Sequence, residues 1–217
     1  MCGRYFIDDG DQYFEMKSIL ARMKEAYGDT IEYRAARVGE IFPNDTVPVI
    51  IPAKELNLDV VPMRWGFTSP GTSRLMINAR SEGIFERTRF KKSAAQCRCL
   101  VPASAFFEWN HSQPQGKRVK YRVSLRPSET DKRIPSMYFA AVYDKVIDSA
   151  TGKSAARFVI ITKESRGAIR TLHDRMPVPV DKSESYKWLN GNVNHAREVL
   201  FDSVVPDYFF SGLGIIS

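Results

Sequence analysis

Residues 98–109 read RCLVPASAFFEW, and this stretch is the clearest indication of the fold class. It combines aliphatic and aromatic residues with few charges, which is typical of a strand that is buried in a sheet. Runs of the same kind recur along the chain between proline, glycine and polar clusters. They are VPVIIP at 47–52, LDVVPMRWGF at 58–67, VKYRVSLR at 119–126, SMYFAAVYDKV at 136–146 and ARFVIITKE at 156–164. The sequence therefore predicts a protein built largely from short strands.

Helices are expected on either side of these strands. Residues 13–27 carry apolar side chains at spacings of three and four, which predicts an amphipathic helix that ends at Gly28. Two short helices are expected at 183–191, capped by Ser183 or Ser185, and at 192–201. No internal repeat or linker divides the chain, so we expect one α+β domain over residues 1–217, with mainly antiparallel strands bent into a barrel or a sandwich and helices outside.

Composition restricts the class of protein. The chain has 217 residues, a formal net charge of +7 and 43% hydrophobic residues. No run approaches the roughly 20 apolar residues that cross a membrane, and no secretory signal is recognised. The three cysteines are an odd number, which argues against a disulfide framework and favours a cytoplasmic protein. The positive charge suits a polyanion such as nucleic acid, although a basic surface that binds nothing is an equally good interpretation.

Four positions place a reactive or polar group where packing does not require one. They are Cys2 in MCGRY, Asn78 in INARSE, Glu108 in FFEW and His173 in LHDRMP. A carboxyl group among aromatic residues would be desolvated, which raises its pKa and suits general acid or base catalysis. Each position also has a plain interpretation, such as a turn-forming asparagine or a strand-end glutamate in water.

A metal site is not predicted. Cys97 and Cys99 form a C-x-C pair, but the sequence offers no second pair of cysteines or histidines to complete a zinc site. We therefore expect these two cysteines in the core and no metal or cofactor. The basic run RTRFKK at 87–92 is either a solvated face or a patch that receives phosphates.

The motifs together resemble those of the SOS-response-associated peptidase (SRAP) family. The resemblance covers nearly the whole chain in six separated stretches, which are MCGRY at 1–5, FPN at 42–44, MRWGF at 63–67, INARSE at 77–82, RCLVPASAFFEW at 98–109 and LHDRMP at 172–177. It implies a single SRAP domain with a β-barrel-like core. It also implies activity on abasic sites in single-stranded DNA, within the DNA damage response.

The resemblance assigns roles to individual residues. Cys2, freed by removal of Met1, corresponds to the nucleophile, and Asn78, Glu108 and His173 correspond to the residues around it. The implied DNA contacts are phosphate-binding Arg4, Arg80 and Arg175, aromatic Trp65 and Trp109, and the further positions Pro43, Asn44 and Thr162. The implied partner is single-stranded DNA that contains abasic sites, bound by a monomer in the cytoplasm, or at the nucleoid if the protein is bacterial.

An N-terminal cysteine explains the chemistry that the resemblance implies. Its α-amine has an ordinary pKa of about 7.7–8.0, so part of it is unprotonated at neutral pH and can attack an aldehyde. The neighbouring thiol can then close a thiazolidine ring, which shields the abasic site from strand cleavage. Two alternatives remain at this point, a cysteine-type peptidase that acts on its own N-terminus and a reader that binds modified bases without a covalent bond.

Overall fold

The strands form two main sheets. The computed structural model describes residues 2–53, 57–68, 75–110, 114, 117–147 and 154–215; Met1, whose removal was expected, lies outside these ranges. The first sheet is open, and all its neighbouring strands are antiparallel. Its strands in spatial order are β14 (Tyr208–Ile215), β10 (Val119–Leu125), β9 (Ala105–Trp109), β1 (Arg4–Ile7) and β2 (Gly39–Ile41).

The second sheet closes into a barrel. The closing pair is the long hairpin of β11 (Met137–Ile147) and β12 (Ser154–Glu164). Between them lie β8 (Arg98–Ala103), β3 (Thr46–Pro52) and β4 (Leu58–Trp65). The pairing of β12 with β4 is parallel, whereas the other neighbours in the barrel are antiparallel. The expected α+β domain with a mainly antiparallel, barrel-like core is therefore confirmed.

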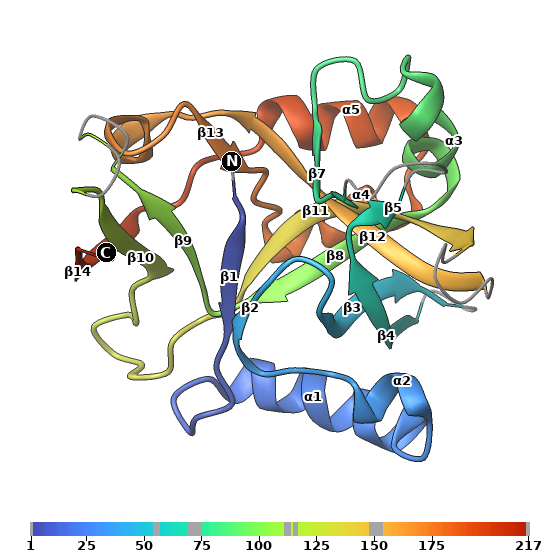
Figure 1. Ribbon diagram of the computed structural model, residues 1–217, viewed down its shortest axis with the longest axis horizontal. Coiled ribbons are helices and arrows are strands. Elements are labelled where there is room, and N and C mark those ends of the chain that lie inside the picture. The colour runs from blue at the N-terminus through green and yellow to red at the C-terminus, as the bar shows by residue number, and fades with distance from the viewer. Residues whose placement is uncertain are drawn as a thin grey trace.

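Short strands are added to the barrel at the end of the molecule where the N-terminus lies. β13 (Arg175–Pro177) pairs with β12 in antiparallel orientation, and β7 (Asn78–Arg80) pairs with it in parallel. A small hairpin joins β5 (Phe67–Thr68) to β6 (Leu75–Met76). In Figure 1 the N-terminus, β13 and β7 lie at the same end of the molecule.

The stretch 98–109 forms two strands that belong to different sheets, whereas the sequence predicted one run. The break falls at Ser104, which is fully buried. Its amide donates to the carbonyl of Phe6 at 2.8 Å, and its hydroxyl accepts from the amide of Asp8 at 2.9 Å. These bonds satisfy the backbone where the chain leaves the barrel for the open sheet. RCLVPASAFFEW therefore joins the two halves of the fold.

Helices cover the outside of the barrel. Helix α1 (Phe14–Tyr27) confirms the predicted amphipathic helix, and α2 (Ile31–Arg34) follows it below the sheets in Figure 1. On the upper right of that view lie α3 (Thr88–Gln96), α4 (Ser185–Asn190) and α5 (Val193–Asp202). The described residues also form two 3-10 turns, η2 (Gly167–Thr171) and η3 (Lys182–Glu184).

The basic run 87–92 lies mostly in α3, where Phe90 is buried while the basic side chains are exposed, as on a solvated face. Two local predictions need correction. Cys97 does not lie in the core, because it is only half-buried at the end of α3, whereas Cys99 is fully buried. The fourth helix is not capped by Ser183 or Ser185. A 3-10 turn precedes it, and the side chain of Asp181 accepts from the amide of Ser183 at 2.9 Å to cap that turn. No helix in the described ranges is long and apolar enough to span a membrane.

Candidate functional site

Cys2 lies two residues before the start of β1. Its side chain is fully buried in the core cluster, and its thiol donates to the carbonyl of Arg4 at 3.7 Å. The side-chain amide of Asn78 donates to the carbonyl of Cys2 at 2.9 Å, across 76 positions of sequence. Asn78 begins β7, and the indole of Trp65 donates to the preceding residue, Ile77, at 2.9 Å. Asn78 is thus fixed on the barrel and holds the backbone of Cys2.

Glu108 provides a carboxyl group that titrates near neutrality. It lies in β9 with an exposed fraction of 1%. Burial raises its pKa to about 7, and the negative charge of Asp174 acts in the same direction. Burial also raises the pKa of the Cys2 thiol, and the charge of Glu108 adds to that effect. These shifts couple Cys2 to Glu108 and connect Glu108 to the segment that carries His173.

His173 follows η2 and lies just before β13. Its Nδ1 is 2.9 Å from the backbone nitrogen of Arg175 and 2.7 Å from a carboxylate oxygen of Asp174. One nitrogen cannot accept from the amide and donate to the carboxylate at the same time. The neutral ring with its proton on Nε2 accepts from Arg175, and the protonated ring donates to Asp174 instead. His173 therefore has a partner in either protonation state.

Arg4 and Trp109 belong to a cluster of cations and aromatic rings on the open sheet. The guanidinium of Arg4 is 4.5 Å from the ring centroid of Phe42 and 5.4 Å from that of Trp109. It also pairs with Glu40 at 3.1 Å, and Lys120 pairs with the same carboxylate oxygen at 2.6 Å. Phe42 is exposed and Trp109 half-buried, so the cluster offers both charge and aromatic surface to solvent.

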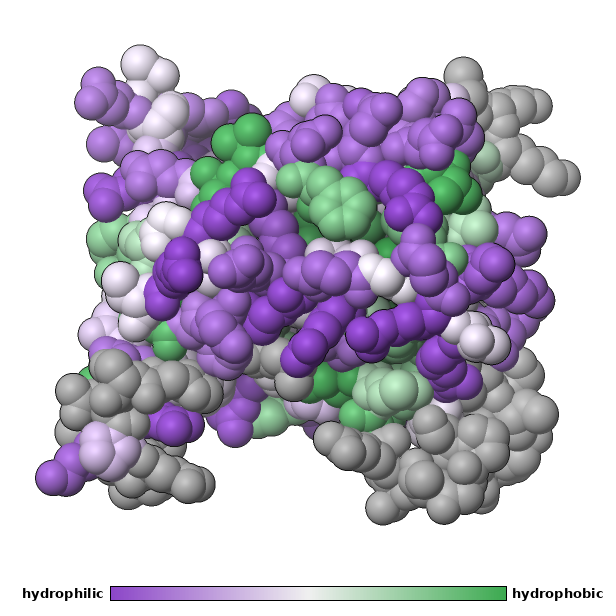
Figure 2. Space-filling model, turned by 90° about the horizontal axis from the view of Figure 1, so that it is seen from above, coloured by the Kyte–Doolittle hydropathy of each residue, from purple (hydrophilic) through white to green (hydrophobic). Residues whose placement is uncertain are grey.

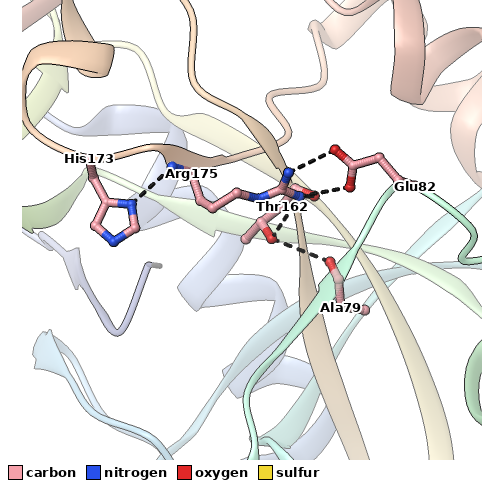
Figure 3. A network of polar contacts seen from close by, with 5 residues as sticks. All are labelled: Ala79, Glu82, Thr162, His173 and Arg175. Carbon is pink, nitrogen blue, oxygen red and sulfur yellow. Dashed lines mark hydrogen bonds and ion pairs between the residues drawn. The ribbon is translucent and has the colours of Figure 1, made fainter.

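Arg80 and Arg175 flank β12 from opposite sides. Arg80 is exposed, and within the described ranges its side chain has neither a hydrogen bond nor an ion pair. Arg175 is different, because its guanidinium binds both carboxylate oxygens of Glu82, at 2.7 and 2.9 Å, and also Thr162 (Figure 3). Of the two arginines expected to bind phosphate, only Arg80 has a guanidinium group without a partner among the described residues.

Trp65 and Thr162 do not lie on a surface that DNA can reach in this structure. Both have an exposed fraction of 0%. The Trp65 ring packs between Tyr5, at 5.2 Å between centroids, and Phe158. The Thr162 hydroxyl is 3.5 Å from the Ala79 carbonyl. The expected direct DNA contacts of these two residues are thus corrected to supporting positions behind the site.

The FPN motif also has a structural explanation. Asn44 has a φ of 76°, in the left-handed region that asparagine tolerates. Its backbone N–H donates to the carbonyl of Trp65 at 2.8 Å. Its side-chain oxygen accepts from buried Arg157 at 3.1 Å. The half-buried Pro43 precedes it, beside exposed Phe42. Asn44 therefore ties this turn to the end of β4, while Pro43 stays close to the aromatic cluster.

The end of the molecule that carries the N-terminus is largely hydrophilic. Figure 2 views the molecule from this end, and hydrophilic residues cover most of the face around smaller hydrophobic patches. Exposed basic residues of the surrounding segments include Arg80, Arg87, Arg89, Lys91, Lys92, Arg166 and Arg170. No group of three or more metal-binding side chains occurs within the described ranges.

The sequence model of the SOS response associated peptidase (SRAP) family matches residues 1–207. The chain belongs to the SRAP family. The match contains all six stretches on which the resemblance rested, including the segments of Cys2, Asn78, Glu108 and His173. It ends one residue before β14, so the last strand of the open sheet lies beyond the part that the family model covers.

Named relatives agree with this membership, and a solved structure shares the fold. The abasic site processing protein YoqW of Bacillus subtilis is 29% identical over 196 residues, covering 88% of this chain and 80% of that protein. The abasic site processing protein HMCES of Rattus norvegicus is 27% identical over 195 residues, covering 73% of this chain and 54% of that protein. A crystal structure of a protein from Bordetella bronchiseptica has the same fold, with a TM-score of 0.72, 19% identity and coverage of 99% and 100%.

Some side chains of this SRAP domain's site were missed by the sequence reasoning. The hydroxyls of Tyr5 and Tyr208 are buried without a hydrogen-bond partner in the described ranges. Burial raises the pKa of both phenols, and Cys2 adds to that effect. Tyr208 comes from β14 and packs against Phe106 at 5.7 Å between ring centroids. Glu82 was present in the quoted motif INARSE, but its charge partner lies 93 positions away, which no local pattern reveals.

Proposed function

We propose that this SRAP protein processes abasic sites in single-stranded DNA by bonding covalently to them through Cys2. The observation that carries the proposal is the group around Cys2, in which Asn78 holds its backbone and Glu108 has a pKa of about 7 beside its thiol. The relatives named as abasic site processing proteins support the substrate class. The proposal requires that the α-amine of Cys2 is free, so Met1 must be removed.

The covalent steps balance without a cofactor. The amine of Cys2 attacks the aldehyde of the open abasic sugar, and the resulting carbinolamine loses one water to give an imine. The thiol then adds across the carbon–nitrogen double bond, so that a carbon–sulfur bond forms and the thiol proton ends on nitrogen. The product is a thiazolidine ring, and no electrons are gained or lost.

Each neighbouring residue has a role that follows from its environment. Glu108 is close to half protonated at neutral pH, so it can take a proton from the ammonium and give one to the departing water. Asn78 orients Cys2 through the carbonyl without transferring a proton. His173, which has a partner in both protonation states, serves sugar ring opening and the reverse reaction.

The environment of Cys2 favours this reaction over peptide hydrolysis. A cysteine peptidase uses a thiolate, which needs a lowered thiol pKa and a base within hydrogen-bond reach. Here burial and Glu108 raise the thiol pKa, and the thiol donates to a backbone carbonyl. A neutral thiol is suited to adding last, to an imine that the amine has already formed.

Binding of the DNA strand is proposed at the aromatic cluster and at Arg80. Guanidinium groups bind phosphates, and exposed rings stack on bases without reading their sequence. Arg4, Phe42 and Trp109 supply both kinds of group beside the start of β1. We propose one chain for each abasic site, because the groups named come from a single chain.

Intact-protein mass spectrometry tests the proposed function. The purified chain is measured before and after mixing with a single-stranded oligonucleotide that carries one abasic site. We expect a protein without Met1 that gains the mass of the oligonucleotide minus one water. A processed protein that forms no adduct would contradict the proposal, and reversible binding that tolerates Cys2→Ala would favour a reader of modified bases.

Two variants separate the amine from the thiol. Cys2→Ser keeps the amine but lacks the thiol, so its imine should hydrolyse on dilution unless it is reduced with borohydride. Cys97→Ser is the matched control, because Cys97 is also a free cysteine but lies at the end of α3, and it should crosslink like the unchanged protein. An equally stable adduct with Cys2→Ser would rule out the thiazolidine.

A further inference from the structure

The guanidinium of Arg175 is already occupied by partners within the chain. Nη1 and Nη2 donate to the two carboxylate oxygens of Glu82, and Nη2 also donates to the carbonyl of Thr162 at 2.5 Å. Nε is buried without a partner among the described residues. Glu82 therefore fills the fork of the guanidinium, and Thr162 accepts a further hydrogen bond from Nη2 (Figure 3).

The two members of this ion pair differ in their access to solvent. The side chain of Arg175 is 12% exposed, whereas that of Glu82 is 52% exposed. The carboxylate thus lies on the solvent side of the guanidinium. An anion that approaches Arg175 from solvent meets Glu82 first.

A phosphate and a carboxylate bind a guanidinium in the same way, through two parallel N–H···O bonds. We propose that the Glu82 carboxylate occupies the place of a DNA phosphate on Arg175 and is displaced when DNA binds. This inference rests on the proposed binding of DNA at Arg80 and extends it to Arg175, on the strand at the other side of β12. Glu82 then acts as an affinity-determining residue, since every phosphate that reaches Arg175 must first break the Glu82 contact.

Competition by Glu82 and a purely supporting role for Glu82 predict opposite changes in DNA affinity when Glu82 is removed. If Glu82 only oriented Arg175 towards DNA, its removal would weaken binding. If Glu82 competes with the phosphate, its removal strengthens binding, because Arg175 no longer has to give up a partner. The hydrogen bond to Thr162 keeps the guanidinium in place in either case.

The experiment measures binding of a fluorescent single-stranded oligonucleotide without an abasic site, so that no covalent step contributes. Glu82→Gln keeps the size of the side chain and removes its charge. We expect a dissociation constant lower by roughly threefold to fivefold, as for loss of a competing partly exposed ion pair. Thermal unfolding of each variant verifies that it is folded.

Glu86→Gln is the matched control. Glu86 follows four positions later, is 58% exposed and pairs with Arg197 at 2.5 Å, so its substitution removes the same charge and also releases an arginine. We expect a change below about twofold for this variant, since it alters the screened general field and releases an arginine that is not among the proposed DNA contacts. In the Arg175→Gln background, Glu82→Gln should give no gain.

Each remaining outcome overturns the inference. Weaker or unchanged binding by Glu82→Gln would show that Glu82 does not compete with DNA. An equal gain with Glu86→Gln, or a gain that persists without Arg175, would reduce the effect to general charge. Absence of binding by the unchanged protein would contradict the proposed function as well, and so is distinguishable from failure of the exchange alone.

Discussion

Glu108 is kept in the folded protein at an energetic cost that depends on pH. Its folded pKa of about 7 exceeds the ordinary value of 4.5, so between these values the native state binds more protons than the unfolded state. The contribution of this carboxyl to stability therefore falls as the pH rises through that interval. At 1.36 kcal/mol for each pKa unit, the full cost above pH 7 is about 3 kcal/mol.

Glu108→Gln should therefore stabilise the protein at high pH. The amide has a similar size and no charge, so we expect the free energy of unfolding to rise by about 1–3 kcal/mol at pH 8 and to change little at pH 5. Urea unfolding at the two pH values measures the difference. Equal effects at the two pH values would mean that the pKa of the Glu108 carboxyl group is not raised in the folded state.

The same substitution should remove a feature of the proposed reaction. With Glu108 present, the crosslinking rate should change slope near pH 7, where this group titrates. In the Glu108→Gln variant the rate should be lower, and the pH profile should lose the titration of this carboxyl group. Single-turnover rates between pH 5.5 and 9 test this, and an unchanged profile would remove Glu108 from the proton transfers.

At the scale of residues, candidate site positions could be predicted where a single side chain contrasted with its neighbours. Cys2, Asn78 and Glu108 each place a polar group in an apolar stretch, and the structure brings these three together. Tyr208 and Glu82 gave no such contrast, because their significance depends on partners from distant parts of the chain. Trp65 was expected on the surface and is fully buried, because an aromatic residue in a motif can pack in the core as readily as it can face solvent.

The junction between β4 and β5 depends on a residue without a side chain. Gly66 has a φ of 105°, and a Cβ at this position would be 2.5 Å from Cγ of Leu75. Its amide donates to the carbonyl of Phe158 at 2.7 Å, which prevents the backbone from moving away. The glycine therefore keeps Trp65 and its hydrogen bond to Ile77 in place beside Asn78.

Gly66→Ala should destabilise the protein by about 2–4 kcal/mol, as backbone strain and a steric clash add. Gly39→Ala separates the two contributions, because Gly39 has a φ of 87° and open space around its Cβ position. It should cost only the strain, about 1 kcal/mol. Chemical unfolding of both variants measures the comparison, and equal losses would show that the Leu75 clash is relieved.

β14 should matter for stability although it lies beyond the family match. It covers the edge of β10, and Tyr208 packs its ring on Phe106 in the core. Truncation after Asp207 should lower the melting temperature by roughly 5–15 °C, given about 2–4 °C for each kcal/mol in a chain of this size. Phe209→Ala, at a residue 44% exposed on the same strand, is the control and should have a small effect.

The long elements could be predicted from sequence and the shortest ones could not. Helix α1 and the longer strands have enough residues to show a pattern of apolar side chains; these strands are β3, β4, β8, β9, β10, β11 and β12. β7 and β13 have three residues each and exist because β12 offers them hydrogen bonds. These two carry or adjoin Asn78 and His173, so the placement of the candidate site depends on the elements that are hardest to predict.

At the scale of the whole molecule, the candidate site lies where the open sheet meets the barrel. β1 and β9 bring Cys2 and Glu108 from the open sheet, while β7 and the segment before β13 bring Asn78 and His173 from the barrel. Figure 1 shows α1 at the opposite end of the molecule. The proposed DNA face is therefore far from α1, so substitutions at the two places can be compared.

Binding of single-stranded DNA should weaken with added salt, because each neutralised phosphate releases counterions. Arg80→Gln removes an exposed cation near the site, so the slope of log affinity against log salt should become shallower by about 0.7, the value for one contact on a single strand. Arg22→Gln removes the same charge from α1 and should leave the slope unchanged. Titrations at several salt concentrations measure both variants, and equal slopes for Arg80→Gln and Arg22→Gln would mean that DNA does not contact Arg80.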